Sequence, residues 1–134
     1  MSARAGGHSM RTGELGISYD AGEYLFRQGE AGNRMFLILD GEVEILVREH
    51  GRPVSIATYG PGEFVGEEAV VEKGTHSSDG RAITSVRMLA VDRRQFLRRL
   101  NEDPTLTLSI LKQLSRRVRT LGGELARLRV RAPH

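Results

Sequence analysis

Short runs of β-forming residues, separated by glycines, dominate the chain between Ile17 and Asp92. Each run has the length of a strand, and no long helical pattern lies between them. The pairs Asp40-Gly41 and His50-Gly51 are typical of tight turns that join neighbouring antiparallel strands. The expected strands are Tyr24–Phe26, Met35–Leu39, Val43–Val47 and Ser55–Tyr59, with further strand over Ala82–Val91. This pattern predicts a mainly β protein built as an antiparallel sandwich or barrel.

Length and composition bound the class of protein. The chain has 134 residues, of which 39% are hydrophobic, enough for one compact domain with its own core. No stretch approaches the roughly 18 apolar residues of a membrane span, and Met1 to Asp20 lacks the apolar centre of a secretory signal. We therefore expect a cytoplasmic protein with a flexible tail over residues 1–16 and one domain over residues 17–134. In that domain, residues 17–91 are expected to be β-structure and residues 92–131 helical.

Helical signals take over at Asp92. Asp92 can cap a helix in which Gln95 completes a reciprocal capping pair, and Asp103 followed by Pro104 is typical of a second helix start. Apolar residues of the second helix then recur at spacings of three and four, which is the period that lets two helices pack side by side. We call this set the leucine seam: Leu111, Leu114, Val118, Leu121, Leu125 and Leu128. Gly122-Gly123 interrupts it, at about 1 kcal/mol per glycine relative to alanine.

Two uses of the leucine seam are open. A helix that packs on its own barrel would account for Leu106, Leu108 and Ile110. Beyond Val118, a barrel of this size is too small to cover the whole apolar stripe, which favours a homodimer formed through the seam.

Charge is unevenly distributed along the chain. Residues 1–92 carry 9 basic and 14 acidic side chains, whereas residues 93–134 carry 11 and 3, so net charges of −5 and +8 follow. Such a basic segment is typical of a solvated arginine-rich helix face, and nonspecific nucleic-acid binding is the weaker alternative. No recognition helix follows before His134, so sequence-specific DNA binding is not expected. The arginines concerned are Arg116, Arg117, Arg119, Arg127, Arg129 and Arg131.

The stretch from Pro61 to Val71 is the candidate binding motif. A proline and two glycines allow a tight turn, and a short helix over Glu67–Val71 can begin directly after Gly66. Amide groups at such a start favour an anion, and the Glu67 carboxylate can accept hydrogen bonds from a sugar hydroxyl. This pairing suits a ligand that carries both phosphate and ribose.

Catalytic and metal sites find no support in the sequence. The four histidines are scattered without metal-ligand spacing, which argues against a cupin enzyme, and the absence of cysteine excludes thiolate metal sites. His76, Ser77 and Asp79 include the residue types of a hydrolytic triad, but neighbours on one loop rarely reach triad geometry. Adjacent acids such as Glu67 and Glu68 usually point in different directions. We therefore expect a protein that is not an enzyme and holds no metal.

Over residues 17–128 the sequence resembles the cyclic nucleotide-binding domain family. That family includes catabolite activator-type regulators, regulatory subunits of protein kinase A, and cyclic-nucleotide-gated channels. The resemblance is carried by an ordered set of segments: Ala21-Gly22-Glu23, Phe26-Arg27-Gln28-Gly29-Glu30, Met35–Val43, Pro61–Glu67 and Val86–Arg93. It implies an antiparallel β-roll, a jelly-roll-like barrel, followed by two helices called B and C.

The resemblance also implies a ligand site. In binding members a phosphate-binding cassette begins with a Gly-Glu pair, here Gly66-Glu67, whose carboxylate contacts the ribose 2′-hydroxyl. An arginine about nine residues later neutralises the cyclic phosphate; here that place is taken by His76. The sequence departs again where Ser77-Ser78-Asp79-Gly80 replaces a small-small-Thr-Val run and where Glu68 replaces an apolar residue. The residues expected to contact cAMP or cGMP are Gly66, Glu67, Glu68, Ala69, His76, Ser77, Ser78, Ile45, Ile56 and Val65, with Ile45 and Ile56 as the apolar wall.

The missing arginine has a calculable cost. A charged hydrogen bond contributes about 1.5–3 kcal/mol net, so its loss lowers affinity roughly 10- to 150-fold. An imidazole such as that of His76 replaces it only when protonated, which is a minority state at neutral pH. Asp79 and Glu68 add negative charge, and the spacing places Arg81 on the following strand.

Two functions remain open. The first is a non-enzymatic sensor with weakened affinity, in which the segment from Glu67 to Gly80 becomes ordered on binding and repositions the helices for a partner chain. The second is a ligand-independent module for dimerisation or protein interaction.

Overall fold

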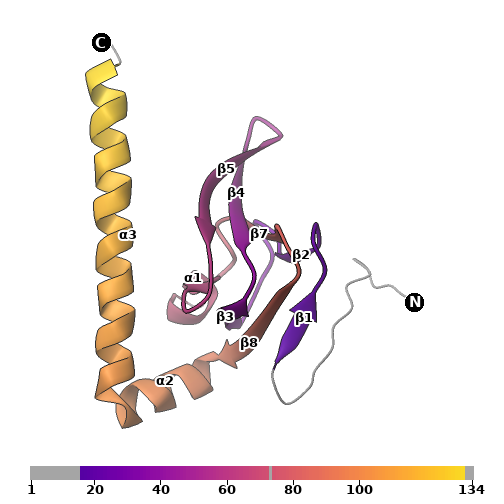
Figure 1. Cartoon of the computed structure of the whole chain (residues 1–134), viewed down its shortest axis with the longest axis vertical. Helices are drawn as coiled ribbons and strands as arrows, with labels where there is room; N and C mark the ends of the chain where they lie inside the picture. Colours follow the sequence, from indigo (N-terminus) through magenta and orange to yellow (C-terminus); the bar gives the residue numbers. More distant parts are fainter. Residues whose placement is uncertain (1–15, 73, 132–134) are drawn as a thin grey trace. The chain divides into compact units, whose positions relative to one another are not determined.

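A computed structural model describes residues 16–72 and 74–131 of the chain (Figure 1). The chain divides into two compact units, Met1–Phe96 and Leu97–His134. The first is β-structure and the second is helical, which confirms the predicted mainly β fold with C-terminal helices. Except for Gly16, the predicted flexible tail lies outside the described residues.

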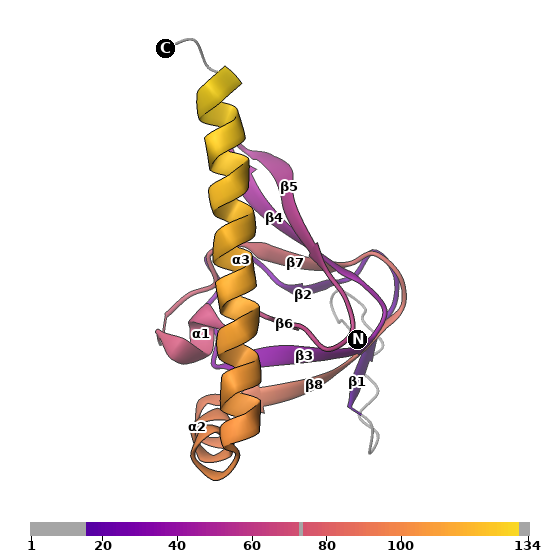
Figure 2. The ribbon, with the colours of Figure 1, turned by 60° about the vertical axis from the view of Figure 1, so that its left-hand side comes forward.

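The first unit contains two antiparallel sheets of four strands each, and Figure 2 shows β1, β8 and β3 side by side in one of them. In the described residues the sheets share no strand, so the roll is a sandwich and not a closed barrel. One sheet has the order β1 (Ile17–Tyr19), β8 (Val86–Asp92), β3 (Arg34–Asp40) and β6 (Phe64–Val65). The other has the order β2 (Tyr24–Phe26), β7 (Asp79–Ala82), β4 (Val43–Glu49) and β5 (Arg52–Tyr59).

A single hydrophobic core lies between the two sheets. Ile38 on β3 and Met88 on β8 belong to one sheet, Val43 on β4 belongs to the other, and all three side chains are completely buried. Alternate residues of each strand point inward, because successive side chains of a strand face opposite sides of the sheet. Phe26 on β2 and Val65 on β6 extend this core to the candidate site.

The structure corrects one predicted strand. The sequence indicated continuous strand from Ala82 to Val91, but β7 ends at Ala82 and β8 begins at Val86, in the other sheet. The three residues between them carry the chain from sheet to sheet. Their turn is held by the amide of Ile83, which donates to the carbonyl of Glu42 at 2.9 Å.

The hairpin of β4 and β5 also differs from the prediction at one end. β5 starts at Arg52 rather than Ser55, because Pro53 is tolerated on a strand at the edge of a sheet. His50 and Gly51 have φ angles of 53° and 80°, as expected for a two-residue turn with both central residues in the left-handed region.

Both predicted helix starts are confirmed. α2 (Arg93–Glu102) follows a capping box in which the amide of Gln95 donates to Asp92 Oδ1 at 2.8 Å and the amide of Asp92 donates to Gln95 Oε1 at 3.0 Å. α3 (Pro104–Arg131) follows Asp103, whose carboxylate accepts the amide of Leu106 at 3.1 Å.

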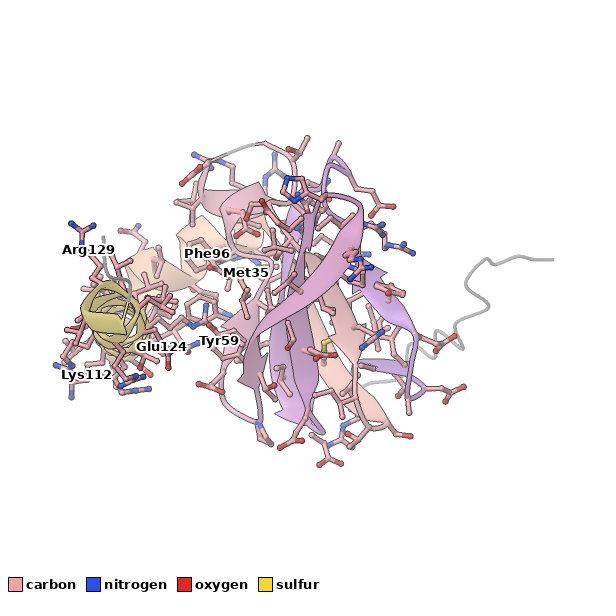
Figure 3. All side chains as sticks on the ribbon, turned by 90° about the horizontal axis from the view of Figure 1, so that it is seen from above. Met35, Tyr59, Phe96, Lys112, Glu124 and Arg129 are labelled. Atoms are coloured by element: carbon pink, nitrogen blue, oxygen red, sulfur yellow. The ribbon has the colours of Figure 1, made fainter. Side chains whose placement is uncertain are left out.

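α3 is one continuous helix that includes Gly122-Gly123. Every residue of the leucine seam is exposed in the single chain, from 37% for Leu114 to 69% for Val118. Figure 3 looks along this helix, where Lys112, Glu124 and Arg129 point away from its axis.

None of the helices in residues 16–72 and 74–131 is both long and apolar enough to cross a membrane. The cytoplasmic location remains a prediction.

Candidate functional site

The cassette begins at Gly66, directly after β6. Gly66 has a φ of 75°, and a Cβ added there would lie 3.2 Å from the Phe26 ring and 3.3 Å from His76 Cε1. A left-handed conformation with so little space favours glycine. The chain then turns into α1 (Glu68–Val71), a single helical turn anchored by the buried side chains of Ala69 and Val70. The predicted short helix is therefore present, with Glu67 half-buried at its start.

His76 is part of the packed interior of the roll. Its side chain is only 4% exposed, and its ring stacks on Phe26 with centroids 4.3 Å apart and 17° between the planes. The backbone is fixed as well, because the amide of His76 donates to Glu30 at 2.9 Å and its carbonyl accepts the amide of Gly29 at 2.8 Å. The imidazole is therefore held in the packed interior against the ring of Phe26.

Glu68 and His76 face each other across the cassette. His76 Nδ1 lies 3.7 Å from Glu68 Oε1, and both buried atoms lack a hydrogen-bond partner among the described residues. The second oxygen of Glu68 accepts a hydrogen bond from Ser77 Oγ at 3.3 Å. Glu68 therefore contacts protein groups on the chain that follows α1, and its role in binding a ligand remains a prediction.

Asp79 is the buried acid of the site. Its side chain is fully buried, and Oδ1 accepts the amide of Gln28 at 2.7 Å. Two guanidinium groups approach it: Arg27 Nε lies 3.7 Å from Oδ1, and Arg48 Nη2 lies 3.5 Å from Oδ2. Sequence reasoning counted Asp79 as added negative charge and missed both arginines. Arg48 lies on β4, which pairs with β7, and Arg27 directly follows β2, so the fold of the sheet brings both to Asp79.

The start of the cassette and the segment from Ser77 to Gly80 meet over the ring of Phe26. A Cβ added at Gly80 would lie 2.5 Å from Phe26 Cζ and 2.7 Å from Cε2, and the Cβ of Gly66 would lie 3.2 Å from the same Cε2. Only glycine allows both backbones to approach the ring this closely. The two halves of the predicted cassette are thereby brought together by a shared aromatic contact.

The predicted apolar residues are placed differently from one another. Ile45 and Val65 are buried in the core, and Ile45 pairs with Gly80 across β4 and β7. Ile56 lies on the edge strand β5 and is 50% exposed. Ser78 is buried beside Asp79. The role of these residues in binding a ligand remains a prediction.

Cavities lined by described residues border the cassette. One of about 440 Å³ is lined by Ala31–Asn33, Ala69, Gly74–Thr75 and Arg93, and one of about 170 Å³ includes His76 in its wall. Neither lining includes Glu67 or Ser77, so the predicted contact between carboxylate and ribose lies outside both.

Arg81 lies outside the cassette, as predicted, on β7. Its Nη2 donates to Glu44 Oε1 at 2.7 Å. Hydrogen bonds from Ser55 and Arg81 lower the pKa of Glu44, and the hydrogen bond to Glu44 raises the pKa of Arg81. Arg81 is therefore engaged in a pair on the sheet. In the described residues, no group of three or more histidine or acidic side chains could hold a metal ion.

Comparison with known proteins agrees with this architecture. The CRP-like cAMP-activated global transcriptional regulator of Mycobacterium tuberculosis is 30% identical over 84% of this chain and 50% of its own length. The regulatory subunit of cAMP-dependent protein kinase from Schizosaccharomyces pombe is 32% identical over 63% of this chain and 20% of its own. The crystal structure of the Thermus thermophilus catabolite activator protein superposes with a TM-score of 0.72 at 28% identity, over 83% of this chain and 53% of that one.

The chain spans about half the length of the curated bacterial regulators it matches. Enzymes also occur among the relatives, since a fungal lysophospholipase contains a matching stretch in 7% of its length. Residues 17–103 match the family described as the cyclic nucleotide-binding domain, and the chain belongs to that family.

Proposed function

We propose that this chain is a non-enzymatic regulatory sensor that binds a cyclic nucleotide, cAMP or cGMP, at the cassette. The observation that carries the proposal is the meeting of Gly66 and Gly80 over Phe26, in a member of the cyclic nucleotide-binding domain family. Glu67 lies half-buried at this junction, where its carboxylate would accept the ribose hydroxyl. Ser77, which is exposed on the facing segment, would donate its hydroxyl to the phosphate in place of its present bond to Glu68.

The proposed affinity is weakened but retained. His76 is buried against Phe26 and carries no guanidinium to bond the phosphate, and the missing charged hydrogen bond is worth roughly 10- to 150-fold in affinity. The opposing negative charge is also smaller than the sequence implies, because Arg27 and Arg48 flank Asp79. We therefore expect binding in the micromolar range.

Isothermal titration with cAMP and cGMP at pH 7.5 tests this function. Glu67→Ala should abolish the binding heat, whereas Glu72→Ala, which removes an exposed acid at the other end of α1, should leave it unchanged. His76→Arg should strengthen binding if the arginine reaches the phosphate, and its thermal unfolding must be recorded because it replaces a packed ring. Equal affinity in wild type and Glu67→Ala would contradict the proposed ribose contact.

A second candidate function is a ligand-independent homodimerisation module, favoured by the exposed leucine seam of α3. With Leu111 at heptad position a, Glu124 falls at g and Arg129 at e. In a parallel pair of helices, g of one chain faces the following e of its partner, so Glu124 would meet Arg129 of a second copy. This complementarity supports a parallel homodimer, which is compatible with either function.

Light scattering during size exclusion distinguishes the two candidates when combined with the titration. Leu121→Glu with Leu125→Glu should yield monomers, whereas Arg119→Glu, on the opposite face of α3, should not. A dimer that binds neither nucleotide at pH 7.5 or near pH 6 would favour the interaction module. If the wild type stays monomeric at about 100 μM, well above a micromolar Kd, the dimer is contradicted.

A further inference from the structure

Arg93, the first residue of α2, contacts the end of the cassette helix. Its Nη1 donates to the carbonyl of Val70 and, at 3.3 Å, to the carbonyl of Val71. These are carbonyls of the last turn of α1, which have no partner inside the helix. A guanidinium is well suited to this position, because a cation is favoured at the carbonyl end of a helix.

The other side of Arg93 is fixed to the roll. Asp92 immediately before it is the last residue of β8, where it pairs with Arg34 of β3. Asp92 also forms the capping box with Gln95, so the first turn of α2 is held to the end of the sheet. The Arg93 side chain thus connects two elements that are otherwise separated along the chain by β7 and β8.

The surroundings of Arg93 allow this connection to shift. Its side chain is half-buried, and it borders the cavity of about 440 Å³ together with Ala69 and the loop of Ala31–Asn33. Because this cavity is open beside Ala69 of α1, it leaves space into which α1 can move without overlapping neighbouring atoms. A displacement of α1 would then act on α2 through the guanidinium.

We propose that Arg93 is a positioning residue that couples the cassette to α2. In this account a movement of α1 is transferred through the carbonyls of Val70 and Val71 to the first turn of α2, and along α2 into the helical unit. The use of this coupling for nucleotide sensing rests on the proposed function. The mechanical link itself does not require a ligand.

Amide hydrogen exchange, followed by NMR on the whole chain, tests the link without a ligand. Arg93→Met removes the charged hydrogen bonds and keeps a similar helix propensity. Exchange should accelerate at least 10-fold both at Val71 and Glu72 and in the first turn of α2, the ratio expected for loss of a charged hydrogen bond. Arg93→Lys should restore part of the protection, and Arg94→Met, which changes the exposed neighbour, should have no effect.

The outcomes separate a coupling residue from a simple helix cap. Acceleration in α1 alone would show a local cap, and acceleration in neither element would show no link; either result overturns the proposal. With saturating cAMP, exchange should change in α1 and α2 of wild type, but only in α1 of Arg93→Met. If wild type binds neither nucleotide, the proposed function fails, while the ligand-free comparison still decides the link.

Discussion

Substitution of the buried acid of the site gives a quantitative test of its electrostatics. Asp79→Asn keeps the size of the side chain and removes its charge. The amide of Gln28 would still donate to Oδ1, but through a neutral acceptor, which weakens that bond by about 1 kcal/mol. The new amide group would also point at Arg48, where a buried donor without an acceptor costs about 1–3 kcal/mol.

The solvent exposure of the two arginines limits the total loss of stability in Asp79→Asn. Removing one partner of a fully buried ion pair costs about 3–5 kcal/mol, but the side chains of Arg27 and Arg48 are 44% and 41% exposed and regain water. Asparagine is also less costly to bury than a carboxylate, and this offsets a further part of the lost stability. We therefore expect Asp79→Asn to lower the free energy of unfolding by about 2 kcal/mol.

Urea denaturation at one protein concentration measures this change. With a slope of about 1–3 kcal/mol/M, the midpoint should fall by about 1 M. Asp40→Asn, at an exposed acid at the end of β3, should change the free energy of unfolding by less than about 0.5 kcal/mol. A value that small for Asp79→Asn would refute the assignment of Asp79 as a stabilising charge held by its neighbours.

Three further substitutions test the packing and electrostatics. Gly80→Ala should destabilise the roll by about 1–3 kcal/mol in urea denaturation, because its Cβ would overlap the ring beneath it; an unchanged midpoint would contradict the tight contact. Gly122→Ala should raise the free energy of unfolding by about 1 kcal/mol in thermal denaturation, because alanine favours the helix and nothing lies within 4 Å of its Cβ. A lower free energy of unfolding would argue against an unobstructed helix. Glu44→Gln should lower stability at pH 7. Because hydrogen bonds from Ser55 and Arg81 hold the pKa of Glu44 below its ordinary 4.5, the difference from wild type should be full above pH 4.5 and vanish as pH falls through the lowered pKa.

Local features of the sequence predicted much of the fold. The turn at His50-Gly51 and the capping pair of Asp92 with Gln95 depend on residues close together in the chain, and both are present. The extension of β5 through Pro53 was missed, because proline is excluded from central strands and only sheet order shows this strand to be at an edge. The passage between sheets after Ala82 was missed as well, since strand propensity does not say which sheet a residue joins.

The local structure around the candidate site was predictable only in part. Gly66 and the helix after it were identified from the turn, but the burial of His76 against Phe26 depends on the packing of distant strands. The two arginines beside Asp79 could not be predicted for the same reason, because the folded sheet brings them there from distant parts of the chain. The leucine seam of α3 follows from its spacing of three and four residues, and all of its residues are exposed in the single chain.

Nucleotide binding at the cassette is tested most directly by an NMR titration of the isotope-labelled chain with cAMP and cGMP. The account predicts saturable shifts at the amides of Gly66–Ala69 and Ser77–Gly80, with a Kd in the micromolar range, and their loss in Glu67→Ala. Absence of saturable shifts up to about 1 mM of either nucleotide, a binding free energy weaker than about −4 kcal/mol, would contradict it. So would shifts confined to the arginines of α3, which would indicate charge attraction alone.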